Sequence, residues 1–174
     1  MVFSSHVFIF YFLPLALATY YALPPRGRVL ALTLLSYVFY GWANPLFMVL
    51  MLVSTLIDYV MALAIVGERP GSGYSRTLPE GEARTRQQKR ALVVSVCSNL
   101  ALLGFFKYFN FATENYDALI EAIGLPGLSL DLAFRVTLPL GISFYTFQSM
   151  SYTIDVYRGH APAQRQFLDF ACYV

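Results

Sequence analysis

Residues 138–159 read LPLGISFYTFQSMSYTIDVYRG, and this stretch decides the fold. Its length suits a helix that crosses a bilayer, which takes about 17–25 residues. The stretch is nevertheless polar, because its side chains include Ser143, Thr146, Gln148, Ser149, Ser151, Thr153 and Asp155. Unsatisfied polar groups are costly in hydrocarbon, so these side chains cannot all face lipid. The stretch therefore predicts a membrane helix that packs against other helices or borders a wet cavity.

One face of this helix is a candidate functional surface. At about 100° per residue, that face carries Gly141, Phe144, Gln148, Ser151 and Asp155, with Tyr145 and Tyr152 at its edge. An ionisable group inside a membrane helix marks a candidate functional site. We predict that the polar members of this face, together with Tyr152, line a channel or form an interhelical hydrogen-bond network. An ion pair between Asp155 and Arg158, or another loop arginine, is a third interpretation.

The composition agrees with a protein embedded in a lipid bilayer. The chain is 57% hydrophobic and only 13% charged, whereas soluble domains average about 25% charged residues. The formal net charge of +2 is too small to indicate nucleic acid as a partner. We therefore predict an all-α fold, a polytopic transmembrane helix bundle.

Apolar runs that precede the central stretch predict further helices. They cover residues 7–23, 29–42, 46–66 and 91–106, so that five crossings are expected in total. Pro14 is expected to kink the first of these helices. The run over 29–42 is short for a core about 30 Å thick, and a re-entrant segment is the alternative there.

The remaining segments are expected at the membrane surface. Residues 107–135 predict an outer-side surface segment that includes an amphipathic helix over 113–123. Thr137 and Pro139 are the expected N-cap and first turn of the central helix. A further element is expected to begin at Phe167.

Basic residues predict the orientation of the chain. Residues 67–90 form a polar, basic loop, which is interpreted as a cytoplasmic loop that fixes the topology, with an anion-binding site as the alternative. With five crossings, this loop lies on the same side as Arg28 and Arg158. The positive-inside rule then places the N-terminus on the outer side of a bacterial inner membrane.

A second polar position lies in the run over 46–66. Ser54, Thr55, Asp58 and Ala62 share one helical face, and the buried carboxyl of Asp58 must meet protein or water. Ser95, Ser98 and Asn99 give the run over 91–106 a polar stripe. Asp58 therefore either has a functional role or is a single hydrogen-bonded carboxyl in a helix-packing seam.

The central stretch resembles the signature of the membrane-bound O-acyltransferase family in its bacterial branch. The segments MVFSSHVFIFYFLPLALATYY, SYVFYGWANP and LLGFFKYFNF, at residues 1–21, 36–45 and 102–111, resemble the same branch in the same order. The resemblance covers nearly the whole chain. It implies that residues 1–174 are the N-terminal part of a single membrane-embedded acyltransferase domain.

The resemblance also implies an activity. It is the transfer of an acetyl group to hydroxyls of an exported polysaccharide such as alginate. The donor is unknown, with acetyl-CoA or a carrier-bound acetyl group as possibilities, and soluble or periplasmic acetylation proteins are expected partners. Acyl or D-alanyl transfer to teichoic acid or cellulose is the alternative within the class, and a transporter or membrane scaffold is the alternative outside it. The chain shows no second copy of the central stretch, as an inverted-repeat transporter would.

The chain offers few catalytic candidates of its own. Acyl transfer to a hydroxyl needs a base, and His6 and His160 both lie outside the apolar runs, where a solvated histidine is the ordinary interpretation. There is no GxSxG or HExxH motif and no metal-ligand cluster in the sequence. Members of the family carry an essential histidine well downstream of the central motif. We therefore expect the catalytic residues beyond Val174, and residues 1–174 alone to be inactive.

Overall fold

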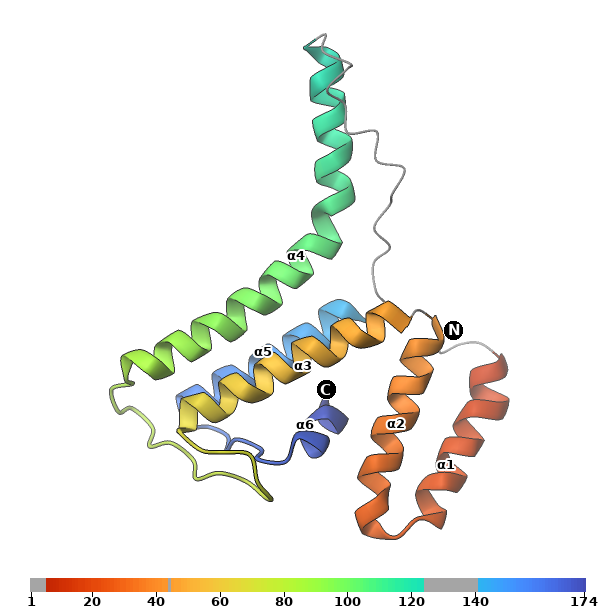
Figure 1. Ribbon diagram of the computed structural model, residues 1–174, viewed down its shortest axis with the longest axis vertical. Coiled ribbons are helices and arrows are strands. Elements are labelled where there is room, and N and C mark those ends of the chain that lie inside the picture. The colour runs from red at the N-terminus through yellow and green to blue at the C-terminus, as the bar shows by residue number, and fades with distance from the viewer. Residues whose placement is uncertain (1–5, 44, 124–140) are drawn as a thin grey trace.

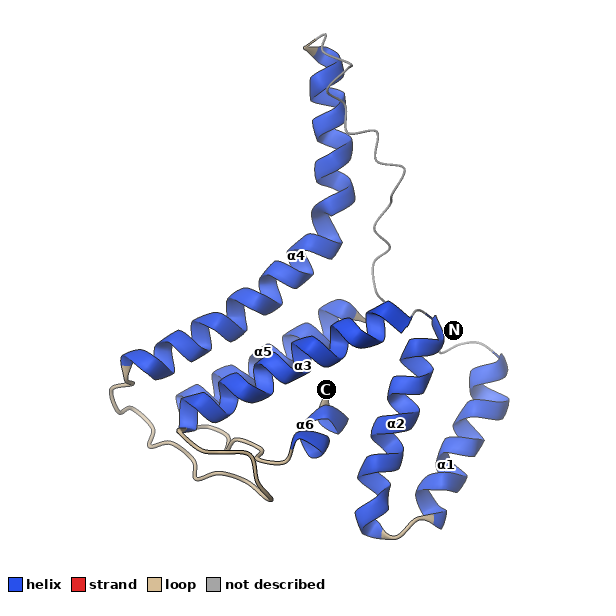
Figure 2. Ribbon diagram, viewed as in Figure 1, coloured by secondary structure: helices blue, strands red, loops and turns tan. Residues whose placement is uncertain are grey.

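The chain folds as a set of packed helices. The computed structural model describes residues 6–43, 45–123 and 141–174. In chain order the elements are η1 (Phe8–Phe12), α1 (Leu13–Ala22), α2 (Pro25–Ala43), α3 (Pro45–Val66), α4 (Arg86–Ala122), α5 (Ile142–Arg158) and α6 (Phe167–Tyr173) (Figures 1 and 2). Across these described ranges no strand is formed, and a single antiparallel bridge joins Tyr74 to Gln164. The all-α prediction is confirmed.

Two of the described helices are long and apolar enough to cross a membrane. They are α3, with 22 residues, and α4, with 37 residues. The segment Phe8–Ala22 is a shorter apolar helix. By length and composition these helices are those of a membrane protein, as the sequence predicts.

The first two helices form a hairpin beside the others (Figure 1). Pro14 falls in the first turn of α1, and the chain before it is π-helical over Phe8–Phe12. A wider, π-helical turn therefore precedes Pro14, and the kink expected at this proline stays a prediction. The rings of Phe8 and Phe12 lie 5.0 and 5.1 Å from that of Phe39 in α2, and this aromatic contact joins the two helices.

Helix α2 is longer than the sequence predicts. It begins at Pro25, where proline suits the first helical turn, and continues for 19 residues to Ala43. At about 1.5 Å per residue, such a helix is about 28 Å long, close to the thickness of the hydrocarbon core. It is one continuous helix, and its crossing of the membrane stays a prediction.

The centre of the structure is formed by α3, α5 and the first half of α4. Figure 1 shows α3 and α5 side by side, with α4 starting next to them. One apolar cluster lies near the C-terminal ends of α3 and α5 and includes Leu63, Ile65, Val156 and Phe170, each at most 4% exposed. A second, smaller cluster contains Met51, Ile142 and Tyr145. These clusters fix which face of α5 is turned toward its neighbours.

The structure corrects the prediction for residues 86–123. The sequence predicted a loop to residue 90, an interfacial break near 107 and a separate surface helix over 113–123. Instead, α4 is one helix from Arg86 to Ala122, and it begins with a capping box between Thr85 and Gln88. No proline interrupts it, so the amphipathic part continues the same helix. Residues 124–135 of the predicted surface segment lie outside the described residues.

Helix α4 is too long for a single straight crossing. Its 37 residues extend about 55 Å, against a hydrocarbon core of about 30 Å. Figure 1 shows that it bends partway along, and that its second half stands away from the other described helices. That half exposes large apolar side chains such as Tyr108, Phe111 and Leu119.

Helix α5 begins later than predicted. Its first residue is Ile142, and Gly141 before it has a φ of 74°, in the left-handed region. The predicted N-cap Thr137 and first-turn residue Pro139 lie outside the described residues. The predicted final element is confirmed as α6, which begins at Phe167.

Two loops meet at one end of the bundle. The loop over 67–85, which joins α3 to α4, pairs with the segment over 159–166 that follows α5. The backbone bonds between them include Gly71 N–H to the Arg165 carbonyl (2.9 Å) and Arg165 N–H to the Gly73 carbonyl (2.9 Å). The Arg165 guanidinium also lies 3.1 Å from a carboxylate oxygen of Glu68. The basic loops predicted to lie on one side are therefore in direct contact.

The end of this loop and the first turn of α4 close the C-terminal ends of α5 and α3. Arg84 donates to the carbonyls of Tyr157 (2.8 Å) and Arg158 (3.0 Å), and Gln88 donates to the carbonyl of Ile65 (2.8 Å). The last carbonyls of a helix lack intrahelical partners and carry partial negative charge, so an arginine there both caps and neutralises the end. Arg84 therefore has a structural role. The interpretation of the loop as a cytoplasmic loop that fixes the topology is compatible with that role.

Candidate functional site around α5

A buried hydrogen-bond cluster joins α3, α4 and α5. Its centre is Asp58 of α3, which is 0% exposed. Ser95 Oγ of α4 donates to Asp58 Oδ1 (2.6 Å), and Asn99 Nδ2 donates to both carboxylate oxygens (2.8 and 2.9 Å). Ser149 Oγ of α5 donates to Oδ2. The carboxyl of Asp58 thus accepts hydrogen bonds from both neighbouring helices.

The partners of Asp58 are themselves satisfied. Asn99 accepts a hydrogen bond from Ser54 Oγ (3.2 Å) through its own side-chain oxygen, and it donates to the Ser95 carbonyl (2.9 Å). Ser95, Asn99 and Ser149 are each at most 1% exposed. A fully satisfied buried network fixes the positions of the helices that contribute to it. The cluster therefore sets the register of α5 against α3 and α4.

The buried face of α5 is different from the face that the sequence singled out. Its inward residues are Ile142, Tyr145, Thr146, Ser149, Thr153 and Val156. Of the predicted face, Phe144 is 74% exposed, Gly141 and Ser151 are exposed, and Gln148 is partly exposed. Within the described part of the chain, α3 and α4 thus cover the other side of α5. A channel-lining role for the predicted face remains a prediction.

The outer face of α5 is hollowed and only partly apolar. A depression of about 680 Å³ is lined by Ser143, Phe144, Phe147, Gln148 and Ser151. Gln148 donates from its side chain to the Tyr173 carbonyl at the end of α6, and Ser151 Oγ donates to the Gln148 carbonyl (2.9 Å). Three of the five residues are therefore polar, on a face that, among the described helices, only the end of α6 meets.

A deeper cavity lies next to this face, between the α1–α2 hairpin, α5 and α6. Its volume is about 750 Å³, and its lining includes Phe39, Tyr40, Tyr145 and Gln148. The rings of Tyr40 and Tyr145 meet edge to face with centroids 6.3 Å apart. Their buried hydroxyls approach each other, but neither makes a well-formed hydrogen bond within the described residues. The cavity is therefore mostly apolar, with a small number of polar groups at its wall.

The other predicted residues of α5 lie at its C-terminal end. Tyr152 packs on Phe170 with ring centroids 4.9 Å apart, and its hydroxyl accepts the Gln164 N–H (2.7 Å). Asp155 is 48% exposed, and one carboxylate oxygen lies 3.9 Å from His160 Nδ1. The structure thus gives Asp155 a histidine as its neighbour, where the sequence suggested an arginine.

The structure therefore divides the five predicted site residues into two groups. Asp58 lies in the buried cluster, whereas Gln148, Ser151, Tyr152 and Asp155 lie along the other side and end of α5. Ser149, which bonds to Asp58, was not among the site residues predicted from the sequence. The spacing of Thr146, Ser149 and Thr153, at intervals of three and four residues, was the available signal.

Neither histidine is placed to act as a base within a closed site. His6 is exposed at the start of the first helix, and the His160 side chain is 53% exposed. Among the described residues, no group of three or more His, Cys, Asp or Glu side chains is arranged to hold a metal ion. The described side chains around α5 can thus hold other groups in position or line a substrate path.

Comparison with known proteins gives consistent results along the whole chain. The chain is 41% identical over all 174 residues to the probable alginate O-acetylase AlgI of Azotobacter vinelandii and 41% identical to that of Pseudomonas aeruginosa. It covers 32% and 30% of these two proteins. The peptidoglycan O-acetyltransferase of Helicobacter pylori is 31% identical over 163 residues, which are 91% of this chain and 27% of that protein.

The chain thus spans about a third of the length of the curated relatives that it matches. No family model and no solved structure matches it. The resemblance to membrane-bound O-acyltransferases is nevertheless confirmed, because from the first residue to the last this chain is a relative of proteins named as alginate O-acetylases.

Proposed function

We propose that this chain is part of a membrane-bound O-acyltransferase that transfers acetyl groups to hydroxyls of an exported polysaccharide, alginate above all. The observation that carries the proposal is the 41% identity over all 174 residues to alginate O-acetylases, of which the chain covers about a third. The more distant relative that acetylates peptidoglycan modifies another polymer of the cell envelope. The shared chemistry is O-acetyl transfer, and the acceptor is the feature that differs.

The contribution of residues 1–174 is a wall of the reaction chamber. The outer face of α5 supports this role, because Ser143, Gln148 and Ser151 line a depression there. In a bilayer, these polar side chains would face hydrocarbon, and the Tyr173 and Gln148 carbonyls meet only part of their hydrogen-bonding capacity. This face therefore borders either the remaining polypeptide of a longer enzyme or the path of a polar substrate.

The Asp58 cluster supports that wall from behind. It holds α5 through Ser149, on the opposite side from Gln148 and Ser151. A substrate-lining helix needs such a support, because a small displacement of a positioning group weakens catalysis strongly. Asp58 is thus a positioning residue, and we assign no catalytic base to residues 1–174.

The topology belongs to the same proposal. Helices α1 to α5 make five crossings of a bacterial inner membrane, with the N-terminus on the outer side. The paired loops over 67–85 and 159–166 lie in the cytoplasm, which agrees with their basic residues and with their mutual contacts. Acetyl-CoA or a carrier-bound acetyl group supplies the acyl group, and soluble acetylation proteins act with the membrane protein.

A chimera tests the proposed function. Residues 1–174 replace the matching third of the Azotobacter vinelandii relative, and the hybrid is produced in a strain that lacks that relative. We expect acetyl groups on the exported alginate, measured by chemical shift changes in its NMR spectrum. A hybrid that reaches the membrane in normal amount and leaves alginate unacetylated would contradict the proposal. The intact relative and an empty vector are the two controls.

A second arm examines the acceptor. The same third is placed in the Helicobacter pylori relative, and acetylation of peptidoglycan is measured. Activity in the alginate hybrid alone supports alginate as the acceptor, whereas activity only in the peptidoglycan hybrid would overturn that assignment.

A further inference from the structure

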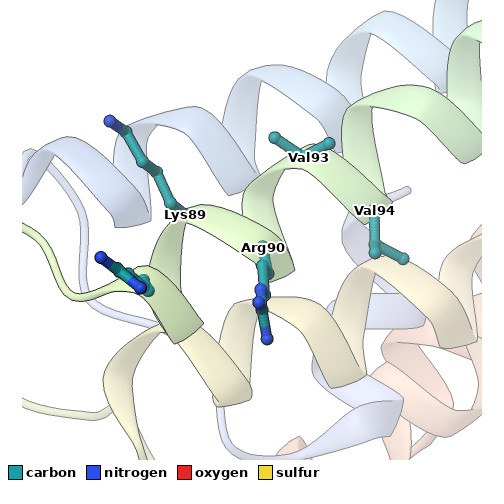
Figure 3. Close-up of a pocket in the computed structure, with 5 residues that line it drawn as sticks. Lys89, Arg90, Val93 and Val94 are labelled. Atoms are coloured by element: carbon teal, nitrogen blue, oxygen red, sulfur yellow. The ribbon is translucent and has the colours of Figure 1, made fainter.

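A cationic hollow lies on α4 where this helix leaves the loop. It has a volume of about 510 Å³ and is lined by Arg86, Lys89, Arg90, Val93 and Val94. Figure 3 shows the cationic side chains extending from the start of α4, with the two valines one turn further along. The spacing explains this order, because Val93 and Val94 follow Lys89 and Arg90 by four residues each. The surface of the hollow is almost wholly apolar, so the stems of the cationic side chains and the two valines line it, and the charged groups extend beyond it.

The three cations of the hollow have no protein partner among the described residues. Two other arginines at this end of the bundle behave differently: Arg84 donates to two carbonyls, and Arg165 pairs with Glu68. The first turn of α4 contains no acidic residue that would pair with the cations of the hollow. All three are exposed. They are therefore available for an external anion.

The grouping of three cations at the start of α4 destabilises this helix when no anion is bound. Arg86 and Arg90 are four residues apart, so two like charges are neighbours on the helix surface. Positive charge at the start of a helix also opposes the helix dipole. An anion in the hollow would relieve both costs, and the loop arginines that cap helices would not contribute to binding it.

The position of the hollow indicates the source of the anion. The apolar part of α4 begins at Ala91, directly after the cations, and Val93 and Val94 are 55% and 49% exposed. The cations therefore lie at headgroup depth if α4 crosses the bilayer, and the valines lie at the depth of the first acyl carbons. A soluble anion would use the cations alone, whereas a lipid would use both parts.

We infer that this hollow binds an anionic phospholipid, with the phosphate among Arg86, Lys89 and Arg90 and the upper acyl chain against Val93 and Val94. Basic clusters beside a membrane helix attract anionic lipids, because the cations lie at the depth of the lipid phosphates. The lipid would hold the start of α4, and with it the paired loops, at a fixed depth. This inference rests on α4 crossing the membrane and is independent of acetyl transfer.

The test is lipid retention by the purified chain. The delipidated protein is mixed with equal amounts of phosphatidylglycerol and phosphatidylcholine in detergent, and bound lipids are counted by native mass spectrometry. We expect phosphatidylglycerol to be retained about tenfold over phosphatidylcholine, and the preference to disappear in Arg86→Gln/Lys89→Gln/Arg90→Gln. A charge-matched control, Arg69→Gln/Arg76→Gln/Lys107→Gln, removes three cations elsewhere and should keep the preference.

Two further arms make the result decisive. In Val93→Gln/Val94→Gln the cations remain, and lipid retention should still fall severalfold because the acyl contact is lost. Inorganic phosphate, added as a competitor, should leave lipid retention unchanged. Equal loss in the charge-matched control, or displacement of the lipid by phosphate, would overturn the inference. Circular dichroism of each variant shows that the helices are intact, and the valine variant keeps the test valid if the triple variant does not fold.

Discussion

The two faces of α5 are both polar, but they differ in what meets them. On the inner face, Ser149 bonds to Asp58, and Thr153 Oγ1 donates to the Ser149 carbonyl (3.0 Å). On the outer face, Gln148 and Ser151 border a hollow, and their side chains donate to nearby carbonyls of α6 and of α5 itself. Polarity alone therefore does not separate a packing face from a functional face. What separates them is that α3 and α4 bury the polar groups of the inner face, whereas Gln148 and Ser151 on the outer face stay partly or fully exposed.

The largest expected effect comes from the inner face. Asp58→Ala removes the acceptor for Ser95, Asn99 and Ser149, so several buried donors lose their partner at once. Each unsatisfied buried group costs about 1–3 kcal/mol, and we expect the free energy of unfolding to fall by about 3–4 kcal/mol. Unfolding with increasing SDS in mixed micelles, followed by circular dichroism, measures it.

A second aspartate provides the control for that prediction. Asp155→Ala removes a carboxyl that is 48% exposed, and its effect on unfolding should stay within about 0.5 kcal/mol. Equal losses in the two variants would show that the buried cluster does not hold α5 to α3 and α4, and the contrast between the faces would be lost.

The next largest effect is expected where α5 ends, since both faces depend on that end. Gly159 has a φ of 90°, and the His160 and Gly159 N–H groups bond back to Asp155 and Val156 in a Schellman motif. A Cβ at this position would clash with the Leu78 carbonyl oxygen of the loop. We expect Gly159→Ala to destabilise the chain by about 2–3 kcal/mol, measured by the same unfolding experiment.

Gly67 separates the two causes of that loss, which are the backbone strain at a positive φ and the clash with the Leu78 carbonyl. It has a φ of 71°, but a Cβ there meets nothing within 4 Å. Gly67→Ala therefore reports the backbone strain alone, at about 1 kcal/mol. If both variants lose the same amount, the contact between α5 and the loop at Leu78 contributes nothing.

Much of the fold follows from patterns that the sequence displays. Apolar runs place α3 correctly to within a residue, and the small and polar face of Ser54, Thr55, Asp58 and Ala62 is indeed buried. The boundaries of α4 were missed, because charged residues at 86–90 and 114–121 looked like surface segments. A helix without proline continues through such residues as long as no stop signal appears.

The site was harder to predict for a physical reason. A helical wheel of 138–159 contains two polar stripes, one through Ser149 and one through Gln148 and Ser151. Which stripe is buried depends on the donors and acceptors of α3 and α4, which the periodicity of α5 does not contain. Asp58 and Asn99 supply that information, since their side chains require a third polar partner from the helix packed against them.

A matched pair of serines tests the contrast directly. Ser149→Ala removes one donor to Asp58 and should cost about 1 kcal/mol, since a net hydrogen bond is worth about that much. Ser151→Ala removes a hydroxyl that bonds only to the carbonyl of Gln148, three residues earlier, and should cost less than about 0.5 kcal/mol. Unfolding of the two variants side by side gives the difference, and a larger loss for Ser151 would reverse the assignment of the faces.

The smallest expected effect on stability is at Gln148, and there the readout changes to activity. Gln148→Ala loses a bond to the Tyr173 carbonyl at the surface, so unfolding should shift by less than about 0.5 kcal/mol. In the alginate hybrid, however, Gln148→Ala and Asp155→Ala should lower acetylation of the exported polymer, because the outer face lines the reaction chamber in the proposed enzyme. Acetylation is compared at equal membrane abundance, with Ser98→Ala in α4 as the control away from this face. If both variants keep full acetylation while Ser149→Ala and Asp58→Ala lose it, the outer face is merely covered by protein, and α5 serves catalysis through its inner face alone.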